Sequence, residues 1–108
     1  MRKFDKLRDS KEFSKLYKEA KRWHCEAGVI FYQKSDECKI AFIASKKVGK
    51  AVARNRAKRL LRAVFFTMQT RLKEGKYILV AKQELLSLSF LRLKKNLEWG
   101  FKSLECLK

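Results

Sequence analysis

The strongest structural signal in this sequence is a helical pattern over residues 51–71. Apolar residues recur there at every third or fourth position, which is the spacing of one face of an α-helix. The pattern closes at Lys73, Glu74 and Gly75, because polar residues followed by glycine are typical of a helix end. We therefore expect one long helix that buries one side. Its apolar stripe is Ala53, Ala57, Leu60, Leu61, Val64, Phe65 and Met68.

Two further helices are expected, one near the start of the chain and one over about residues 87–107. Asp9 and Ser10 are suitable N-terminal caps for the first of them. Phe66 lies on the polar side of the long helix, and its simplest role is packing under the last helix. The apolar stripes of the two helices are Phe13, Leu16, Tyr17 and Ala20, and Phe90, Leu93, Leu97, Phe101 and Leu104.

Short apolar, β-prone runs occupy residues 29–32, 40–44 and 77–81. The first two flank a polar connector at residues 33–37, so a hairpin is the simplest interpretation, and Trp23 marks a further strand before it. The order is then helix, two to three strands, helix, strand, helix. This order predicts an α+β fold, a small two-layer α/β sandwich.

Composition indicates one domain and a polyanionic partner. The 108 residues contain no Pro and no Gly- or Ser-rich linker, so we expect a single domain over residues 1–108. The chain has 28 Lys and Arg against 11 Asp and Glu, a net charge of +17. Such a surface repels itself unless a polyanion neutralises it, and nucleic acid does so with release of condensed counterions.

An anionic membrane is the competing partner. No apolar run approaches the roughly 18 residues of a membrane span, and residues 1–10 alternate in charge instead of forming a signal peptide. We therefore expect a cytoplasmic protein with no membrane partner, and no obligate protein partner is evident.

Groups that would support catalysis or metal binding by the chain itself are scattered. A structural zinc site needs four closely paired ligands, and two-metal hydrolysis needs several convergent carboxylates. Asp36 and Glu37 are adjacent, but the other acids are isolated in sequence. We predict no catalytic residue and no metal ligand, and we interpret three residues as free thiols beside one unpaired histidine: Cys25, Cys38, Cys106 and His24.

The basic charge is concentrated on the long helix and just before it. No acid lies between Glu37 and Glu74, a gap that holds eleven basic residues. Most charged helix faces are merely solvated, but this one lacks the acids four residues away that offset like-charge repulsion. An anionic partner is therefore the better hypothesis. The face opposite the apolar stripe carries Asn55, Lys58, Arg59 and Arg62, with Arg54 and Arg56 on its flanks.

The sequence of residues 45–62, SKKVGKAVARNRAKRLLR, strongly resembles the signature of the bacterial ribonuclease P protein subunit. The match is specific because it covers a strand end, a glycine turn and a helix in fixed register. A looser resemblance extends over nearly the whole chain and includes Phe13, Tyr17, Phe31 and residues 77–81. The family commonly has Arg where Lys82 stands, and residues 23–28 follow the family poorly.

The resemblance implies a small α/β sandwich with a left-handed βαβ crossover, although general rules favour a right-handed one. It implies the non-catalytic protein subunit of an endoribonuclease, which binds ribonuclease P RNA and precursor tRNA and supports removal of the 5′ leader. The RNA subunit would perform the chemistry and hold most of the Mg²⁺. The residues implied to bind the catalytic RNA are Lys47, Lys50, Arg54, Asn55, Arg56, Lys58, Arg59 and Arg62.

In the family, a cleft between the basic helix and the sheet holds the single-stranded leader. Unpaired bases stack on aromatic rings without a requirement for sequence, which suits many different leaders. The residues implied to line this cleft are Phe13, Tyr17, Phe31, Lys46, Asn55, Arg59, Arg62 and Lys82.

Three alternatives stay open at this stage. A ribosomal or other structural RNA-binding protein would share the size and charge but would have no need of cleft aromatics. A helix-turn-helix DNA-binding protein needs two helices joined by a tight turn, whereas residues 48–50 follow a strand. An autonomous nuclease is disfavoured by the scattered carboxylates.

Overall fold

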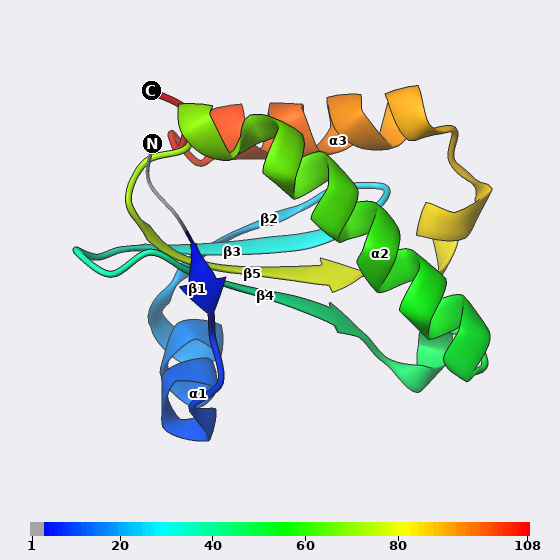
Figure 1. Ribbon diagram of the computed structural model, residues 1–108, viewed down its shortest axis with the longest axis horizontal. Coiled ribbons are helices and arrows are strands. Elements are labelled where there is room, and N and C mark those ends of the chain that lie inside the picture. Colours follow the sequence, from blue (N-terminus) through cyan, green and yellow to red (C-terminus); the bar gives the residue numbers. More distant parts are fainter. Residues whose placement is uncertain (1–3) are drawn as a thin grey trace.

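The computed structural model describes residues 4–108 and contains a five-stranded mixed sheet with the strand order β1-β4-β5-β3-β2. Figure 1 shows α1 on one face of this sheet and α2 with α3 on the other. The elements are β1 (Asp5–Lys6), α1 (Ser10–Glu19), β2 (Lys21–His24), β3 (Gly28–Lys34), β4 (Lys39–Ala44), α2 (Ala51–Met68), β5 (Gly75–Ala81) and α3 (Phe90–Ser103), with 3₁₀ turns at Lys46–Val48, Gln69–Arg71 and Gln83–Ser87.

The predicted hairpin between residues 29–32 and 40–44 is wrong. β3 and β4 do not pair with each other, because β5 lies between them, parallel to β4 and antiparallel to β3. The hairpin of this sheet is instead formed by β2 and β3, where Trp23 pairs with Ile30. The predicted extra strand at Trp23 is therefore confirmed, and β1 is an element that no sequence pattern indicated.

The apolar stripe of α2 packs on one face of the sheet. Five of its seven members, Ala57, Leu61, Val64, Phe65 and Met68, are buried, while Ala53 and Leu60 are half-buried. The ring of Phe65 lies within 5.2–6.3 Å, centroid to centroid, of the rings of five other aromatic residues. Those residues are Phe4, Phe42, Phe66, Tyr77 and Phe101.

α3 lies beside α2 on the same face of the sheet, and four members of its predicted stripe are buried: Leu93, Leu97, Phe101 and Leu104. The fifth, Phe90, is 48% exposed because it stands at the first position of the helix. Phe66 does not pack beneath α3. It is 40% exposed and contacts the rings of Phe42 and Phe65 instead.

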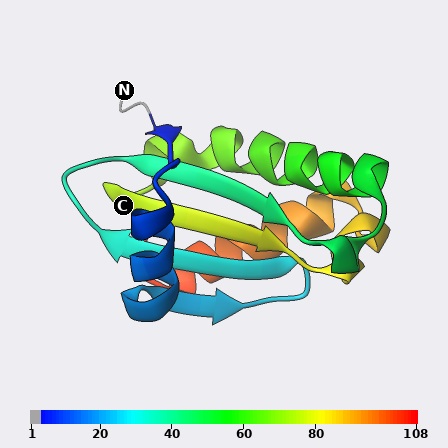
Figure 2. The same cartoon turned by 90° about the horizontal axis from the view of Figure 1, so that it is seen from below.

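α1 covers the opposite face of the sheet, which Figure 2 shows from the α1 side. Successive strand residues point to opposite faces, so Phe31 faces α1 while Ile30 and Tyr32 face α2 and α3. Leu16 of α1 is 1% exposed and packs with Phe31 and Ile78. The predicted two layers therefore become three, with α1 as a partial third layer.

An ion-pair network fastens α1 to the starts of β4 and β5. The Oε1 of Glu12 lies 3.0 Å from Lys39 Nζ, and its Oε2 lies 2.7 Å from Lys76 Nζ. Glu37 approaches both lysines, at 3.4 and 3.8 Å. The hydrogen bond from Lys76, followed by that from Lys39, holds the pKa of Glu12 below its ordinary value of 4.5.

Glu12 should make stability depend on pH in the acid range. A carboxylate whose pKa is lower in the folded chain contributes stability above its unfolded pKa and loses it as the pH falls through the folded value. We expect the free energy of unfolding to decline below about pH 4.5, and to decline less in Glu12→Gln. Urea denaturation over a pH series measures this, with Glu19→Gln, on the same helix but exposed, as the matched control. Superimposable pH profiles for wild type and Glu12→Gln would contradict it.

Candidate nucleic-acid interface

The segment that leads into α2 places its basic residues at the carboxyl end of the parallel strands. β4 ends at Ala44, and the Ser45 side chain accepts a hydrogen bond from the Lys47 backbone N–H at 3.3 Å. Gly49 then has φ 142°, a conformation that side-chain-bearing residues rarely adopt, and it turns the chain into α2. Lys46, Lys47 and Lys50 are all exposed on this turn. No acid lies in the first turn of α2, so these lysines add to the positive end of the helix dipole.

The polar side of α2 forms a surface that we call the α2 ridge: Arg54, Asn55, Arg56, Lys58, Arg59 and Arg62. Four of the six are exposed, and Arg54 and Lys58 are half-buried. Within residues 4–108, neither the ridge nor Lys47 and Lys50 forms an ion pair with a carboxylate. The positive charge of the ridge is therefore left uncompensated by the folded chain.

The three predicted aromatics lie together on the α1 face. The ring centroids of Phe13 and Tyr17 are 6.2 Å apart, and those of Tyr17 and Phe31 are 5.0 Å apart in an edge-to-face arrangement. Their exposure differs: Phe31 is 7% exposed, whereas Tyr17 is 38% exposed. Phe31 thus forms the floor of the cluster, and Tyr17 is the ring that solvent reaches. Burial raises the pKa of the Tyr17 hydroxyl above its ordinary value of 10.0.

Arg22 joins this cluster, although no sequence pattern singled it out. Its guanidinium carbon lies 5.3 Å above the centroid of the Phe31 ring, and its Nη2 donates a hydrogen bond of 2.8 Å to the backbone carbonyl of Tyr17. The signal that could have found it is register, because Arg22 is paired with Phe31 across the β2–β3 hairpin. The cation is held over an aromatic ring beside the exposed face of Tyr17.

The space between α2 and the sheet is filled by the apolar stripe, so the aromatics and the α2 ridge lie on opposite faces of the sheet. The aromatics and the α2 ridge approach each other around the outer edge of β4. Within residues 4–108, this edge is covered only by the two-residue strand β1. A hollow of about 280 Å³ runs along this edge, and we call it the edge groove. It combines side chains from both faces, including Phe13 from α1, Phe42 and Ile43 from β4, and Lys58, Arg62 and Phe66 from α2.

Aromatic and basic groups are interleaved in the edge groove. Arg62 places its guanidinium carbon 5.3 Å from the centroid of the Phe42 ring, and the Phe42 and Phe66 rings are 6.2 Å apart. The structure therefore brings Phe13 and Arg62 to one hollow. It adds Phe42, Lys58 and Phe66, which were not among the residues expected to line a cleft.

Lys46 and Lys82 follow the carboxyl ends of β4 and β5, at the same end of the sheet. Ala44 and Ala81 are partners in the parallel β4–β5 pair, so the segments that follow them start side by side. Lys82 is half-buried, and its Nζ donates a hydrogen bond of 2.9 Å to the carbonyl of Cys25. Lys46 is exposed, and Lys82 is held by the β2–β3 turn.

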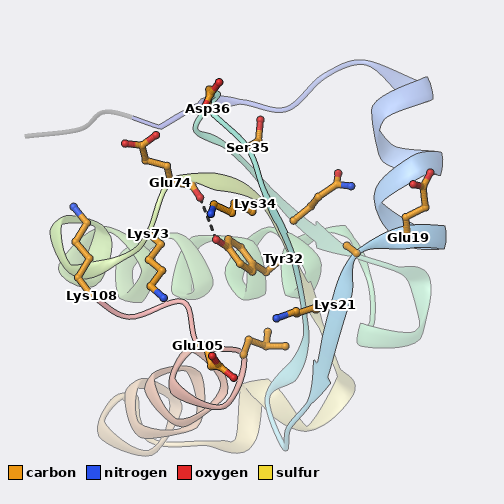
Figure 3. A pocket seen from close by; sticks show the side chains of 13 residues that line it. Glu19, Lys21, Tyr32, Lys34, Ser35, Asp36, Lys73, Glu74, Glu105 and Lys108 are labelled. Atoms are coloured by element: carbon orange, nitrogen blue, oxygen red, sulfur yellow. Dashed lines mark hydrogen bonds between the residues drawn. The ribbon is translucent and has the colours of Figure 1, made fainter.

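A larger hollow than the edge groove lies elsewhere and has mixed charge. It measures about 1030 Å³, and Figure 3 shows Lys21, Lys34, Lys73 and Lys108 around it together with Glu19, Asp36, Glu74 and Glu105. Tyr32 closes its floor with a hydrogen bond of 3.1 Å to the Glu74 carbonyl. A hollow lined by equal numbers of both signs lacks the net positive field that attracts a polyanion.

Other chemistry in the described part of the chain is limited. Within residues 4–108 no three His, Cys, Asp or Glu side chains are grouped so that they could hold a metal ion, and no helix there is both long and apolar enough to cross a membrane. Cys25, Cys38 and Cys106 are free thiols. Burial raises the pKa of the Cys106 thiol to about 12, which keeps it unreactive.

A model of the family described as Ribonuclease P matches residues 1–105. The chain belongs to the bacterial ribonuclease P protein family. A ribonuclease P protein component from a Nitratiruptor species is 43% identical over 91 residues, covering 84% of each chain. One from Bacillus pumilus is 36% identical over 106 residues, covering 94% of this chain and 89% of the relative.

Solved structures support the fold. The ribonuclease P protein of Staphylococcus aureus superposes with a TM-score of 0.86 at 23% identity, covering 98% of this chain and all of that one. That of Thermotoga maritima superposes with a TM-score of 0.76 at 24% identity, covering 87% and 92%. Family membership makes the chain a component of the endoribonuclease that matures tRNA 5′ ends. This assignment replaces the alternatives of a ribosomal protein and of a helix-turn-helix DNA-binding protein.

Phe31 is buried and Tyr17 is exposed, so their replacement by alanine should lower the free energy of unfolding by different amounts. Phe31→Ala should lower the free energy of unfolding by about 3–5 kcal/mol, because a buried ring is replaced by a cavity. Tyr17→Ala should cost only about 1 kcal/mol, a typical value for a point substitution. Urea denaturation measures both. Equal losses in the two variants would show that Tyr17 is as much a core residue as Phe31.

Proposed function

We propose that the α2 ridge, with Lys47 and Lys50, binds the phosphate backbone of the ribonuclease P RNA. The observation that carries this proposal is the uncompensated charge of the ridge, six polar and basic residues with no carboxylate partner within residues 4–108. Arg predominates there, and its planar guanidinium suits bidentate contact with phosphate. Each neutralised phosphate also releases counterions, which favours binding.

We further propose that the 5′ leader of precursor tRNA follows the β4 edge, between the aromatic cluster of α1 and the α2 ridge. Tyr17 offers an exposed ring above the buried Phe31, and Phe13 lies both in the aromatic cluster and in the edge groove. Arg62 and Lys58 face the same groove and would neutralise leader phosphates. The path would be extended by four polar residues, Asn55, Arg59, Lys46 and Lys82. Lys82 donates a hydrogen bond to the Cys25 carbonyl, so it would either leave that carbonyl to contact the leader or hold the β2–β3 turn in position.

The chemistry would remain with the RNA subunit. Mg²⁺ would be held mainly by the RNA, because carboxylates of the chain that could ligate a metal ion already form ion pairs with its own lysines and arginines. Glu12 pairs with Lys39 and Lys76, and Glu26 pairs with Arg92 at 2.8 Å. The protein would contribute affinity for precursor tRNA and help to assemble the RNA around its metal ions.

Two features of the architecture are part of the same proposal. Residues 1–108 would form one RNA-binding domain, although residues 1–3 lie outside those described. The connection from β4 through α2 to β5 would be a left-handed crossover, as the family resemblance implies. β4 and β5 are adjacent and parallel, so the connection between them has to cross over the sheet, and α2 does so on the face opposite α1.

The α2 ridge is tested by single alanine substitutions. Arg56→Ala, Lys58→Ala and Arg59→Ala should each weaken binding to ribonuclease P RNA, and each lost phosphate contact should flatten the log-log salt dependence by about 0.7–0.9. Binding is measured over a salt series, with circular dichroism to verify the fold.

Lys34→Ala is the matched control, because Lys34 is exposed and lines the mixed-charge hollow instead of the ridge. If the ridge variants kept wild-type affinity and salt slope with a native fold, the ridge would be a solvated face and not an RNA contact.

The leader path is tested with Tyr17→Ala in the reconstituted holoenzyme. Loss of one stacked base costs about 1–3 kcal/mol, so affinity for precursor tRNA should fall by roughly fivefold to over a hundredfold. Binding of mature tRNA, which has no leader, should hardly change. Tyr17→Phe keeps the ring and should retain most of the affinity.

The chain alone is the control for cleavage, and it should not cut precursor tRNA until ribonuclease P RNA and Mg²⁺ are added. Equal loss for precursor and mature tRNA in a folded Tyr17→Ala variant would remove Tyr17 from the leader path.

A further inference from the structure

α3 presents an aromatic residue to solvent on the side that faces away from the sheet. Trp99 is 62% exposed, and Leu91, two turns earlier, is 63% exposed. The next residue, Gly100, is buried so closely that a Cβ there would lie 2.5 Å from the side chain of Ile30. α3 therefore rests directly on the sheet at this point, and neither the core nor the edge groove uses the Trp99 ring.

The surroundings of Trp99 carry positive charge. Lys102 Nζ lies 6.0 Å from the centroid of the Trp99 ring, and Lys95 is exposed one helical turn before it. The single acid of α3, Glu98, is paired with Arg71 at 2.8 Å. A large exposed ring flanked by lysines, beside an acid that is already neutralised, is the composition of a surface on which nucleic-acid bases stack.

We propose that Trp99 is a second RNA contact of the chain, where an unpaired base of the ribonuclease P RNA stacks on the indole while Lys95 and Lys102 hold neighbouring phosphates. This inference rests on the proposed binding of that RNA by the α2 ridge. α2 and α3 form one layer on the same face of the sheet (Figure 1). The Arg71–Glu98 ion pair joins the segment that follows α2 to α3. One RNA bound along α2 therefore reaches α3 without crossing the sheet, whereas the leader path lies around the opposite edge, at β4.

Charge complementarity favours RNA over a protein partner or a second copy of this chain. Arg92 and Glu98 of α3 are each paired, with Glu26 and Arg71, which leaves the charge of Lys94, Lys95 and Lys102 on this helix, so two copies placed face to face would repel each other. Leu91 provides an internal comparison, because it is as exposed as Trp99 on the same helix but has no ring. Docking of an apolar partner would use both residues, whereas base stacking would use only Trp99.

The first test follows Trp99 directly by fluorescence. Trp23 and Trp99 are the two tryptophans, so Trp23→Phe leaves Trp99 as the sole indole emitter. Titration with ribonuclease P RNA should quench this emission and protect it from acrylamide. Precursor tRNA without the ribonuclease P RNA is the second arm and should leave the emission unchanged. Quenching by precursor tRNA alone would assign the ring to the substrate and overturn the proposal.

The second test compares affinities for ribonuclease P RNA across matched variants. Trp99→Ala should weaken binding by roughly fivefold to over a hundredfold, Trp99→Phe should retain most of the affinity, and Leu91→Ala should be near wild type. Sedimentation of the free protein should give a monomer for all of them. Equal losses in Trp99→Ala and Leu91→Ala would indicate apolar docking and overturn base stacking.

The two proposals fail in different ways. If the wild-type chain binds ribonuclease P RNA while Trp99 emission and the Trp99→Ala affinity are unchanged, the Trp99 contact is overturned and the α2 ridge stands. If the ridge variants also retain full affinity, the proposed function of the ridge fails as well.

Discussion

The packing of Phe65 is the contact on which the placement of the α2 ridge depends. Its ring is fully buried and meets Phe4 before β1, Phe42 on β4, Tyr77 on β5 and Phe101 on α3. One residue thus fixes α2 against the sheet and against α3. The α2 ridge is the other side of this same helix, so the direction in which its arginines point follows from how the apolar stripe is buried. An RNA surface that must present several cations in fixed register needs such a rigid support.

A net charge of +17 is a cost to the folded state, and its distribution shows how that cost is limited. Carboxylates are placed where cations fasten elements together: Glu12 joins α1 to β4 and β5, Glu26 reaches Arg92, and Glu98 reaches Arg71. The α2 ridge and the turn before it have no such partners within residues 4–108. Repulsion is therefore concentrated where an RNA backbone would relieve it, and binding should stabilise the fold as well as assemble the enzyme.

Local patterns predicted the helices well and the pairing of strands poorly. The stripe of α2 and the cap at Asp9 follow from spacing and side-chain chemistry within a few residues, and both are present. The hairpin between β3 and β4 failed because nothing in residues 29–44 reveals that β5, more than thirty residues later, inserts between them. β1 is too short to leave a pattern. Arg22, Phe42 and Phe66 were missed because their contacts depend on which strand or ring lies opposite them in the fold. Their spacing along the sequence carries no sign of those contacts.

The aromatic cluster illustrates how stability and binding are divided between neighbouring residues. A ring that stacks on bases has to remain accessible, and an accessible ring contributes little to the core. Phe31 is buried and supports Tyr17, while Arg22 over Phe31 supplies a cation without an exposed hydrophobic surface. Trp99 with Lys102 repeats this combination of ring and cation on α3, where the buried Gly100 beside it keeps the helix close to the sheet. In both places the supporting residue is buried and the ring above or beside it is exposed, so the two proposed contacts could be lost without loss of the core.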